Sequence, residues 1–224
     1  MLLALDTATP NTTVAVADDQ HVRAHHSHVD GRRHAEVLAP LIAESLAELE
    51  ITPKELTRIV VGVGPGPFTG LRVGLVTAMA LGDGLGIPVL GVVTLDVVAA
   101  AAVDGTASGT PSFLVATDAR RKEVYWARYV GGVRSGPASV GRAADVAANY
   151  PRCPVAGQGA RLYADVFRAH GCAVVGPEFP SAAALAEVTL RRLERGDAFE
   201  PVAPLYLRRP DAATPGERKP VTRV

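Results

Sequence analysis

The strongest constraint on the fold is an order of apolar runs and turns that occurs twice along the chain. The first half opens with short apolar runs at 2–5, 12–17 and 21–28, which are separated by turn residues and predict an antiparallel meander of strands. The second half opens in a similar way, with paired strands expected at 113–116 and 123–129. In both halves helices and strands then alternate, which predicts an α/β protein of two lobes.

Apolar periodicity predicts the remaining elements. Between His34 and Glu50 apolar residues recur at spacings of one, three and four, as on one face of a helix. A β-branched run follows at 58–63 and is bounded by glycine, which is typical of a strand buried on both faces. An alanine-rich helix is expected to end near Val103. Further helices are expected at 69–81, 142–149, 160–169 and 181–195, and further strands at 89–93, 153–156 and 173–175.

The best candidate for a boundary between the lobes is Asp104–Pro111, which has almost no large apolar side chain. We therefore expect an N-terminal lobe over 1–104 and a smaller C-terminal lobe over 105–207. Residues 208–224 are rich in proline and basic side chains and have little to bury. A flexible tail is expected there.

Composition and charge exclude several classes of protein. The chain has 23 Lys and Arg against 23 Asp and Glu, so it has no bulk positive charge with which to bind nucleic acid by itself. Its two widely spaced cysteines fit neither a disulfide framework nor a four-cysteine zinc site, and they indicate a reducing, cytoplasmic compartment. The most apolar stretch, 88–103, is broken by Gly91 and Asp96. We expect no export signal and no contact with a membrane.

Two acidic residues end the opening strands of the two halves and are candidate ligands for a phosphate or its magnesium ion. Asp6 and Thr7 follow the first strand, and Asp118 and Arg120 occupy the equivalent place in the second half. A turn that ends a strand uses the same residue types, and this is the simpler interpretation. Neither place has the tight glycine turn that sugar-kinase-like ATPases use, so a nucleotide site at these residues is expected to be vestigial.

The most specific segment of the chain runs from Gly62 to Arg72. A phosphate loop directs successive backbone N–H groups at phosphate oxygens, but Pro65 and Pro67 each remove one N–H and no lysine follows. The segment instead predicts a stiff turn that directs the next helix. Gly70 and Gly74 lie four residues apart on one face of that helix and permit close approach of another backbone. The sequence leaves open whether this contact is internal or with a partner.

A cluster of histidines is the remaining candidate for a metal site. Five of the six histidines lie between His21 and His34. On a strand, His26 and His28 share one face and His25 points to the other. No paired carboxylate stands at ligand spacing, so these residues are interpreted as surface histidines of an edge strand, and no metal is expected.

The segment Gly62–Arg72, taken with Leu3-Ala4-Leu5-Asp6-Thr7, Asp118-Ala119-Arg120 and Glu123-Val124-Tyr125, closely resembles the TsaB family, also called YeaZ. The similarity extends over nearly the whole chain, through Pro204–Arg208. Members of that family are the accessory subunit of the bacterial machinery that adds threonylcarbamoyl to adenosine 37 of tRNA. The resemblance implies an actin-like ATPase fold of the sugar kinase and heat-shock type, with two RNase H-like lobes and a degraded nucleotide site.

The resemblance also implies that the chain does not carry out the transfer reaction. The catalytic relative, TsaD, has a similar first lobe with a His-x-x-x-His metal pair. Thr94 and Val98 occupy the two corresponding places in this chain, and neither side chain binds a metal as imidazole does. We therefore expect a non-catalytic scaffold with no cofactor of its own, with ATP and magnesium relevant only in the assembled complex.

A partner surface follows from the same resemblance. The family binds TsaD through two helices of its first lobe, supports the ATPase subunit TsaE, forms a homodimer through the same face when TsaD is absent, and meets tRNA only through the complex. A Gly74→Arg variant is expected to fold and to lose TsaD. The expected interface residues are Ala35, Leu38, Ile42, Gly70, Arg72, Val73, Gly74 and Thr77.

Two alternative functions are weighed against the scaffold. The first is an enzyme acting alone, an ATP-dependent kinase or carbamoyltransferase of the same fold that uses Asp6 and Asp118. The second is a peptidase, which is disfavoured because the sequence has neither a Ser-His-Asp order nor a His-Glu-x-x-His motif.

Overall fold

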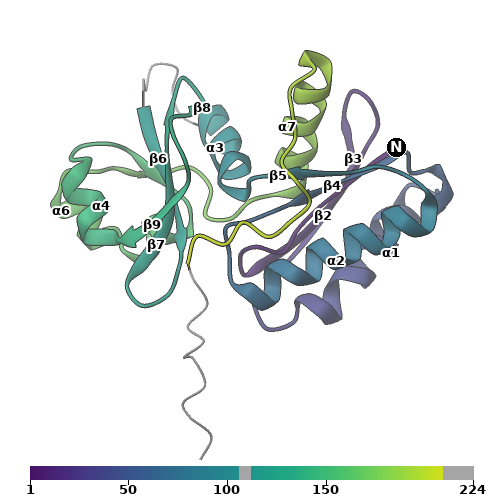
Figure 1. Cartoon of the computed structure of the whole chain (residues 1–224), viewed down its shortest axis with the longest axis horizontal. Coiled ribbons are helices and arrows are strands. Elements are labelled where there is room, and N and C mark those ends of the chain that lie inside the picture. The colour runs from purple at the N-terminus through teal and green to yellow at the C-terminus, as the bar shows by residue number, and fades with distance from the viewer. Residues whose placement is uncertain (106–111, 209–224) are drawn as a thin grey trace, which may run out of the picture.

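The computed structural model describes residues 1–105 and 112–208 of the chain and has two lobes, each built on a mixed sheet (Figure 1). The boundary expected at 104–111 and the tail expected at 208–224 fall mainly on residues outside these ranges. None of the helices within the described ranges is both long and apolar enough to cross a bilayer.

The first sheet has five strands in the order β3-β2-β1-β4-β5. The central strand β1 pairs with β2 in antiparallel fashion and with β4 in parallel fashion, so Leu2 lies opposite both Ala17 and Arg58. The predicted meander and the buried strand after the first helix are both confirmed. The strands are β1 (Leu2–Asp6), β2 (Asn11–Ala17), β3 (Val22–Val29), β4 (Arg58–Gly62) and β5 (Val89–Val92).

The second sheet has the order β11-β10-β6-β7-β8, and β9 also pairs with β7. β6 and β7 form the predicted antiparallel pair, and β10 lies parallel to β6 on its other side. The arrangement around β6 thus repeats that around β1, as the two similar halves of the sequence predict. The strands are β6 (Ser112–Asp118), β7 (Glu123–Val130), β8 (Val133–Arg134), β9 (Ser139–Arg142), β10 (Val155–Ala156) and β11 (Val174–Val175).

Helices cover both faces of the first sheet. Leu3 and Leu5 of β1 belong to the core cluster that includes α1 and α2, whereas Leu2 and Ala4 pack in the cluster that contains α7. This alternation is the period of two expected of a strand buried on both sides. The helices are α1 (His34–Glu48), α2 (Phe68–Leu85), α3 (Thr94–Gly105), α4 (Ala143–Asn149), α5 (Gln158–Leu162), α6 (Ala164–Ala169) and α7 (Ala182–Arg195), with a short 3₁₀ turn η1 (Pro53–Glu55).

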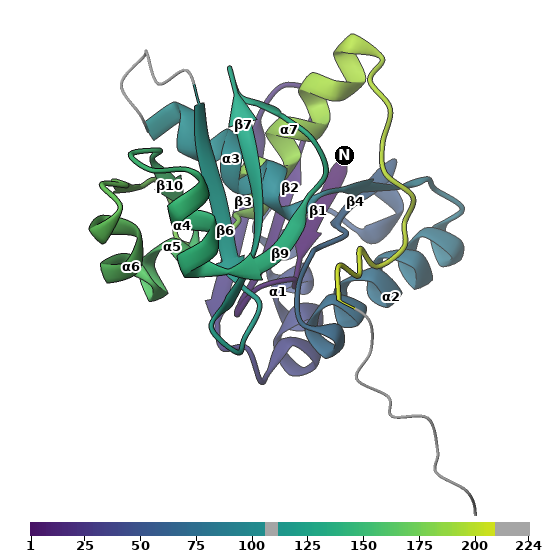
Figure 2. The ribbon, with the colours of Figure 1, turned by 60° about the vertical axis from the view of Figure 1, so that its left-hand side comes forward.

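After the second lobe the chain returns to the first. Helix α7 packs on β1 and β2 and against α3, and the segment that follows it runs back over the first lobe to α2 (Figure 2). Glu200 bridges Gly91, and the N–H of Leu205 donates to the carbonyl of Val63. Residues 182–207, which the sequence order puts in the C-terminal lobe, therefore lie against the first lobe.

Two helix predictions differ from the structure. Helix α2 continues to Leu85 instead of ending at 81, because its late glycines do not stop it and it ends only where Gly86 adopts a left-handed φ of 66°. The helix expected at 160–169 is two short helices, α5 and α6, which meet at Tyr163. Helix α7 forms as expected, since the Ser181 side chain accepts a hydrogen bond from the N–H of Ala184 at its start.

Candidate functional site

The segment from Gly62 to Arg72 attaches the start of α2 to the end of β1. A Cβ on Gly66 would lie 2.1 Å from the carbonyl oxygen of Ala8, so this turn position requires glycine. The Thr7 hydroxyl donates to the carbonyl of Gly70 at 2.8 Å and accepts from the N–H of Gly74 at 3.0 Å. The predicted stiff turn is confirmed, and Thr7 has a structural role in it.

Asp6 lies in the interior, beneath the same turn. Its Oδ1 accepts from the N–H of Ala8 at 2.7 Å, and its Oδ2 accepts from the Thr94 hydroxyl at 2.8 Å. A Cβ on Gly62 would lie 1.9 Å from Oδ2, so the carboxylate is covered on that side. Burial raises the pKa of Asp6 from 3.8 to about 6, although the two hydrogen bonds oppose the change. The carboxylate joins β1, β4 and α3.

Thr94, which the resemblance sets at the place of a metal histidine of TsaD, is thus part of this internal network. Besides donating to Asp6, the Thr94 hydroxyl accepts from the N–H of Gly64 at 3.2 Å. Val98, at the second position, is fully buried in the core cluster that joins the lobes. Both side chains contribute to packing between α3 and its surroundings.

Asp118 and Arg120 lie at a small pocket between the lobes. Asp118 accepts from the N–H of Arg120 at 2.9 Å, and its other oxygen is 3.5 Å from the guanidinium of Arg120. Residues of both lobes line the pocket, including Thr9, His34 and Gln158, but Asp6 and Thr7 do not. Its volume of about 90 Å³ is well below the ~300 Å³ at which ligand pockets usually start. The four candidate nucleotide-binding residues are therefore not brought together.

The eight expected interface residues separate into two groups. Leu38, Ile42, Gly70 and Gly74 are buried inside the first lobe, so none of the four is available to a partner on the outer surface. Ala35 and Arg72 are exposed, and Val73 and Thr77 are half-buried.

The glycine contact that the sequence left open is internal. A Cβ on Gly74 would lie 2.5 Å from the Thr7 hydroxyl oxygen. The expectation that Gly74→Arg folds normally is therefore wrong, because the larger side chain would have to displace β1.

The outer face of α2 carries an apolar stripe that the sequence reasoning did not identify. Phe68, Val76 and Met79 are 51%, 63% and 46% exposed, respectively. The Phe68 ring stacks on Tyr206 with centroids 5.4 Å apart, and the Arg72 guanidinium lies 3.9 Å above the Phe68 centroid and donates to the Tyr206 hydroxyl at 3.1 Å. We call these five residues the α2 stripe.

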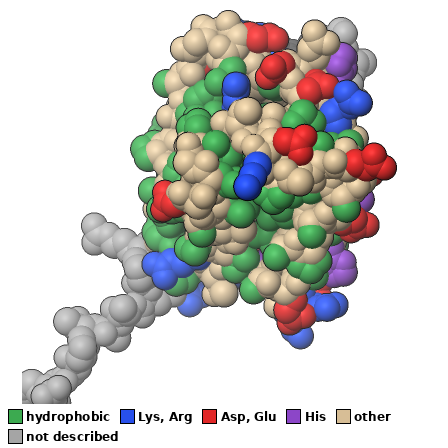
Figure 3. All heavy atoms as spheres, turned by 90° about the vertical axis from the view of Figure 1, so that its right-hand side faces the viewer, with side chains coloured by type: hydrophobic (Ala, Val, Ile, Leu, Met, Phe, Trp, Pro, Cys, Tyr) green, Lys and Arg blue, Asp and Glu red, His purple; other side chains and the backbone are tan. Residues whose placement is uncertain are grey.

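A sequence signal for this stripe existed. Phe68, Arg72, Val76 and Met79 recur at spacings of four, four and three, which puts them on one side of α2 next to the buried face that contains Leu71. The apolar surface of the helix therefore extends beyond the face that packs on the sheet. Tyr206 could not be found in this way because it comes from a distant segment. Figure 3 shows a side of the first lobe on which exposed hydrophobic side chains lie between scattered charges.

His25 and His26 lie, as predicted, on opposite faces of β3. The interpretation as surface histidines is wrong for His34, which is buried at the start of α1 with its Nδ1 2.7 Å from the Thr12 hydroxyl oxygen. His26 contacts α1, with Nε2 2.7 Å from a Glu48 oxygen, whereas His25 lies 3.1 Å from the Thr13 hydroxyl on the other side of the sheet. Within residues 1–105 and 112–208, no group of three or more His, Cys, Asp and Glu side chains could hold a metal ion.

Comparisons with known proteins agree with this architecture. A family model described as TsaD, tRNA N6-adenosine threonylcarbamoyltransferase, matches residues 22–170. An uncharacterized protein of Mycobacterium tuberculosis is 44% identical over 213 residues, which are 94% of this chain and 93% of that protein. The tRNA threonylcarbamoyladenosine biosynthesis protein TsaB of Escherichia coli is 37% identical over 128 residues, 57% of this chain and 54% of that protein.

Among solved structures, YeaZ from Pseudomonas aeruginosa is similar with a TM-score of 0.74 and 29% identity, covering 92% of this chain and 99% of that chain. The two lobes, their mixed sheets and their flanking helices are those of the actin-like ATPase fold. The relatives named TsaB and the solved YeaZ structures agree with each other, and the chain belongs to the TsaB family, also called YeaZ.

Proposed function

We propose that this chain is a non-catalytic scaffold that docks on the transferase subunit TsaD. Its relatives named TsaB support a role in tRNA threonylcarbamoyladenosine biosynthesis. The α2 stripe carries the docking proposal, because it combines exposed apolar side chains with an aromatic pair and an arginine. Interfaces obtain most of their binding free energy from buried aromatic and arginine anchors of this kind.

The internal contacts of the former nucleotide site support the non-catalytic part of the proposal. The Asp6 carboxylate is fully buried and accepts two hydrogen bonds from within the chain. The Thr7 hydroxyl is similarly engaged with the backbone of α2. A catalytic carboxylate has to reach its substrate or metal ion, whereas these two side chains hold β1, α2 and α3 together.

The docking surface includes the α2 stripe together with Ala35, Val73 and Thr77. We propose that the same surface pairs two copies of the chain when TsaD is absent, and that TsaE engages only the assembled complex. The four buried members of the expected set, Leu38, Ile42, Gly70 and Gly74, are left out because they form the contact between the helices and the sheet.

The test is a pair of matched substitutions. Val76→Glu puts a charge in the middle of the α2 stripe at a position that is 63% exposed, so the variant should fold. Val29→Glu is the control, because Val29 is 60% exposed and its place in the alternation of β3 puts it on the face opposite His26 and α1.

Isothermal titration calorimetry with TsaD should give a dissociation constant raised about tenfold or more by Val76→Glu and unchanged by Val29→Glu. Sedimentation velocity should show the same contrast for self-association. Equal dissociation constants for both variants and the parent would exclude the α2 stripe as the docking surface.

A further inference from the structure

A second groove between the lobes lies between α7, α3 and the β7–β8 hairpin. Its volume is about 480 Å³, within the range of about 300–1,000 Å³ that ligand sites occupy. Four arginines and two aspartates line it, so its walls are positively charged although the chain as a whole has no net charge. The arginines are Arg134, Arg191, Arg192 and Arg195, and the aspartates are Asp96 and Asp197.

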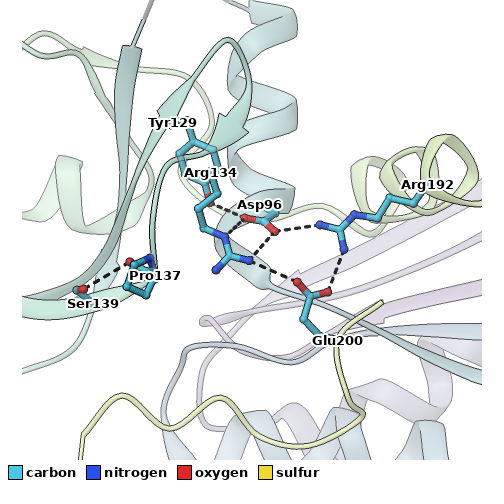
Figure 4. A network of polar contacts seen from close by, with 7 residues as sticks. All are labelled: Asp96, Tyr129, Arg134, Pro137, Ser139, Arg192 and Glu200. Carbon is cyan, nitrogen blue, oxygen red and sulfur yellow. Dashed lines mark hydrogen bonds and ion pairs between the residues drawn. The ribbon is translucent and has the colours of Figure 1, made fainter. Parts of the chain in front are cut away.

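The floor of the groove is a closed ring of ion pairs (Figure 4). Arg192 of α7 lies 3.0 Å from Asp96 and 2.9 Å from Glu200, and Arg134 of β8 lies 2.9 Å from Asp96 and 3.4 Å from Glu200. The Tyr129 hydroxyl donates to Asp96 at 2.7 Å. These two arginines are therefore neutralised by two carboxylates, and they fix the second lobe to α3 and α7.

The rim of the groove carries two arginines whose positive charge is not neutralised by the carboxylates of the ring. Arg191 and Arg195 are exposed and stand four residues apart on α7, so both side chains lie on one face of the helix. Neither side chain makes a hydrogen bond or ion pair with any residue in 1–105 or 112–208. Asp197 is the acidic side chain at the rim. The opening thus presents two free guanidinium groups above a neutral floor.

We propose that this groove binds the phosphate groups of an RNA backbone, with Arg191 and Arg195 as the contacting residues. The proposal rests on the proposed function, in which the chain is part of a complex that acts on tRNA. A guanidinium can donate two parallel hydrogen bonds to a phosphate, and two guanidiniums one helical turn apart can contact neighbouring positions of one strand. Two such contacts add to the affinity of a complex but are too few to hold RNA alone, which agrees with the zero net charge of the chain.

The experiment measures tRNA binding to the complex of this chain with TsaD by fluorescence anisotropy over a series of salt concentrations. The test variant is Arg191→Ala/Arg195→Ala. The control variant is Arg152→Ala/Arg168→Ala, which removes two exposed arginines of the second lobe and changes the net charge by the same amount. Melting temperatures of all three proteins verify that they are folded.

The test variant should lower the affinity for tRNA about fivefold or more at low salt, and reduce the salt dependence of log K by about 0.7–0.9 for each phosphate contact that is lost. The control should bind as the parent does. A test variant that binds TsaD and also binds tRNA with the parent's affinity and salt dependence would overturn the proposal while leaving the scaffold function intact. If the parent fails to bind TsaD at all, it is the proposed function that fails.

A titration of the isolated chain with ATP separates RNA from a small phosphorylated ligand. We expect the double substitution not to change any ATP binding by the isolated chain. ATP binding that depends on these two arginines, together with unchanged tRNA binding, would assign the groove to a nucleotide and refute the RNA site.

Discussion

The buried carboxylate of Asp6 gives a prediction about how the stability of the chain depends on pH. Burial raises its pKa from 3.8 to about 6, so the folded state favours the protonated form. The folded chain binds more protons at this group than the unfolded chain between about pH 4 and 6. The contribution of Asp6 to the free energy of unfolding is therefore largest below pH 4 and is lost as the pH rises through 6.

The size of the effect follows from the two pKa values. From 3.8 to about 6, complete ionisation costs about 3 kcal/mol, of which about 1.3 kcal/mol develops between pH 5 and pH 7. Asp6→Asn removes the titration and keeps the shape of the side chain. Its oxygen can still accept from the N–H of Ala8, and the Thr94 hydroxyl can turn to accept from the new amide.

The assay is urea denaturation of the parent and of Asp6→Asn at several pH values. The free energy of unfolding of the parent, relative to that of Asp6→Asn, should fall by about 1.3 kcal/mol from pH 5 to pH 7. Burial lowers the pKa of His25 and His34, which makes stability change in the opposite direction, but both proteins contain these residues and the effect cancels in the difference. A difference that is flat or rises over this range would contradict the burial of the Asp6 carboxylate, from which its raised pKa follows.

Further substitutions test the packing and the docking surface. Gly74→Ala should lower the free energy of unfolding by about 1–3 kcal/mol, because its Cβ would overlap a buried hydroxyl. Gly84→Ala has open space around it and should raise the free energy of unfolding by about 0.5–1 kcal/mol. Urea denaturation measures both changes. Arg192→Ala should lower the free energy of unfolding by about 1–3 kcal/mol. A double-mutant cycle with Glu200→Ala should give a coupling energy of at least about 0.5 kcal/mol. Additive losses of stability would argue against the ring of ion pairs. Phe68→Ala should change the melting temperature little, since the ring is half exposed, but should weaken TsaD binding in calorimetry.

The two-lobed order of elements and the surplus of apolar side chains on α2 are both visible in the sequence. Both are local properties, because the period of apolar residues is visible within a single helix or strand. The prolines and glycines before α2 also sufficed to predict a stiff turn in place of a phosphate loop. The same local pattern could not say which side of α2 faces the sheet, so it assigned Gly70 and Gly74 to a partner surface although they pack on Thr7.

The surroundings of the polar groups, in contrast, depend on how distant parts of the chain fold together. The buried Asp6 carboxylate has a hydrogen-bond donor in Thr94, which lies 88 residues further along the chain. Arg192 meets Asp96 because α7 returns to the first lobe after the second lobe is complete. Contacts at such separations depend on how the whole chain is routed, and no periodicity in a short window records that route.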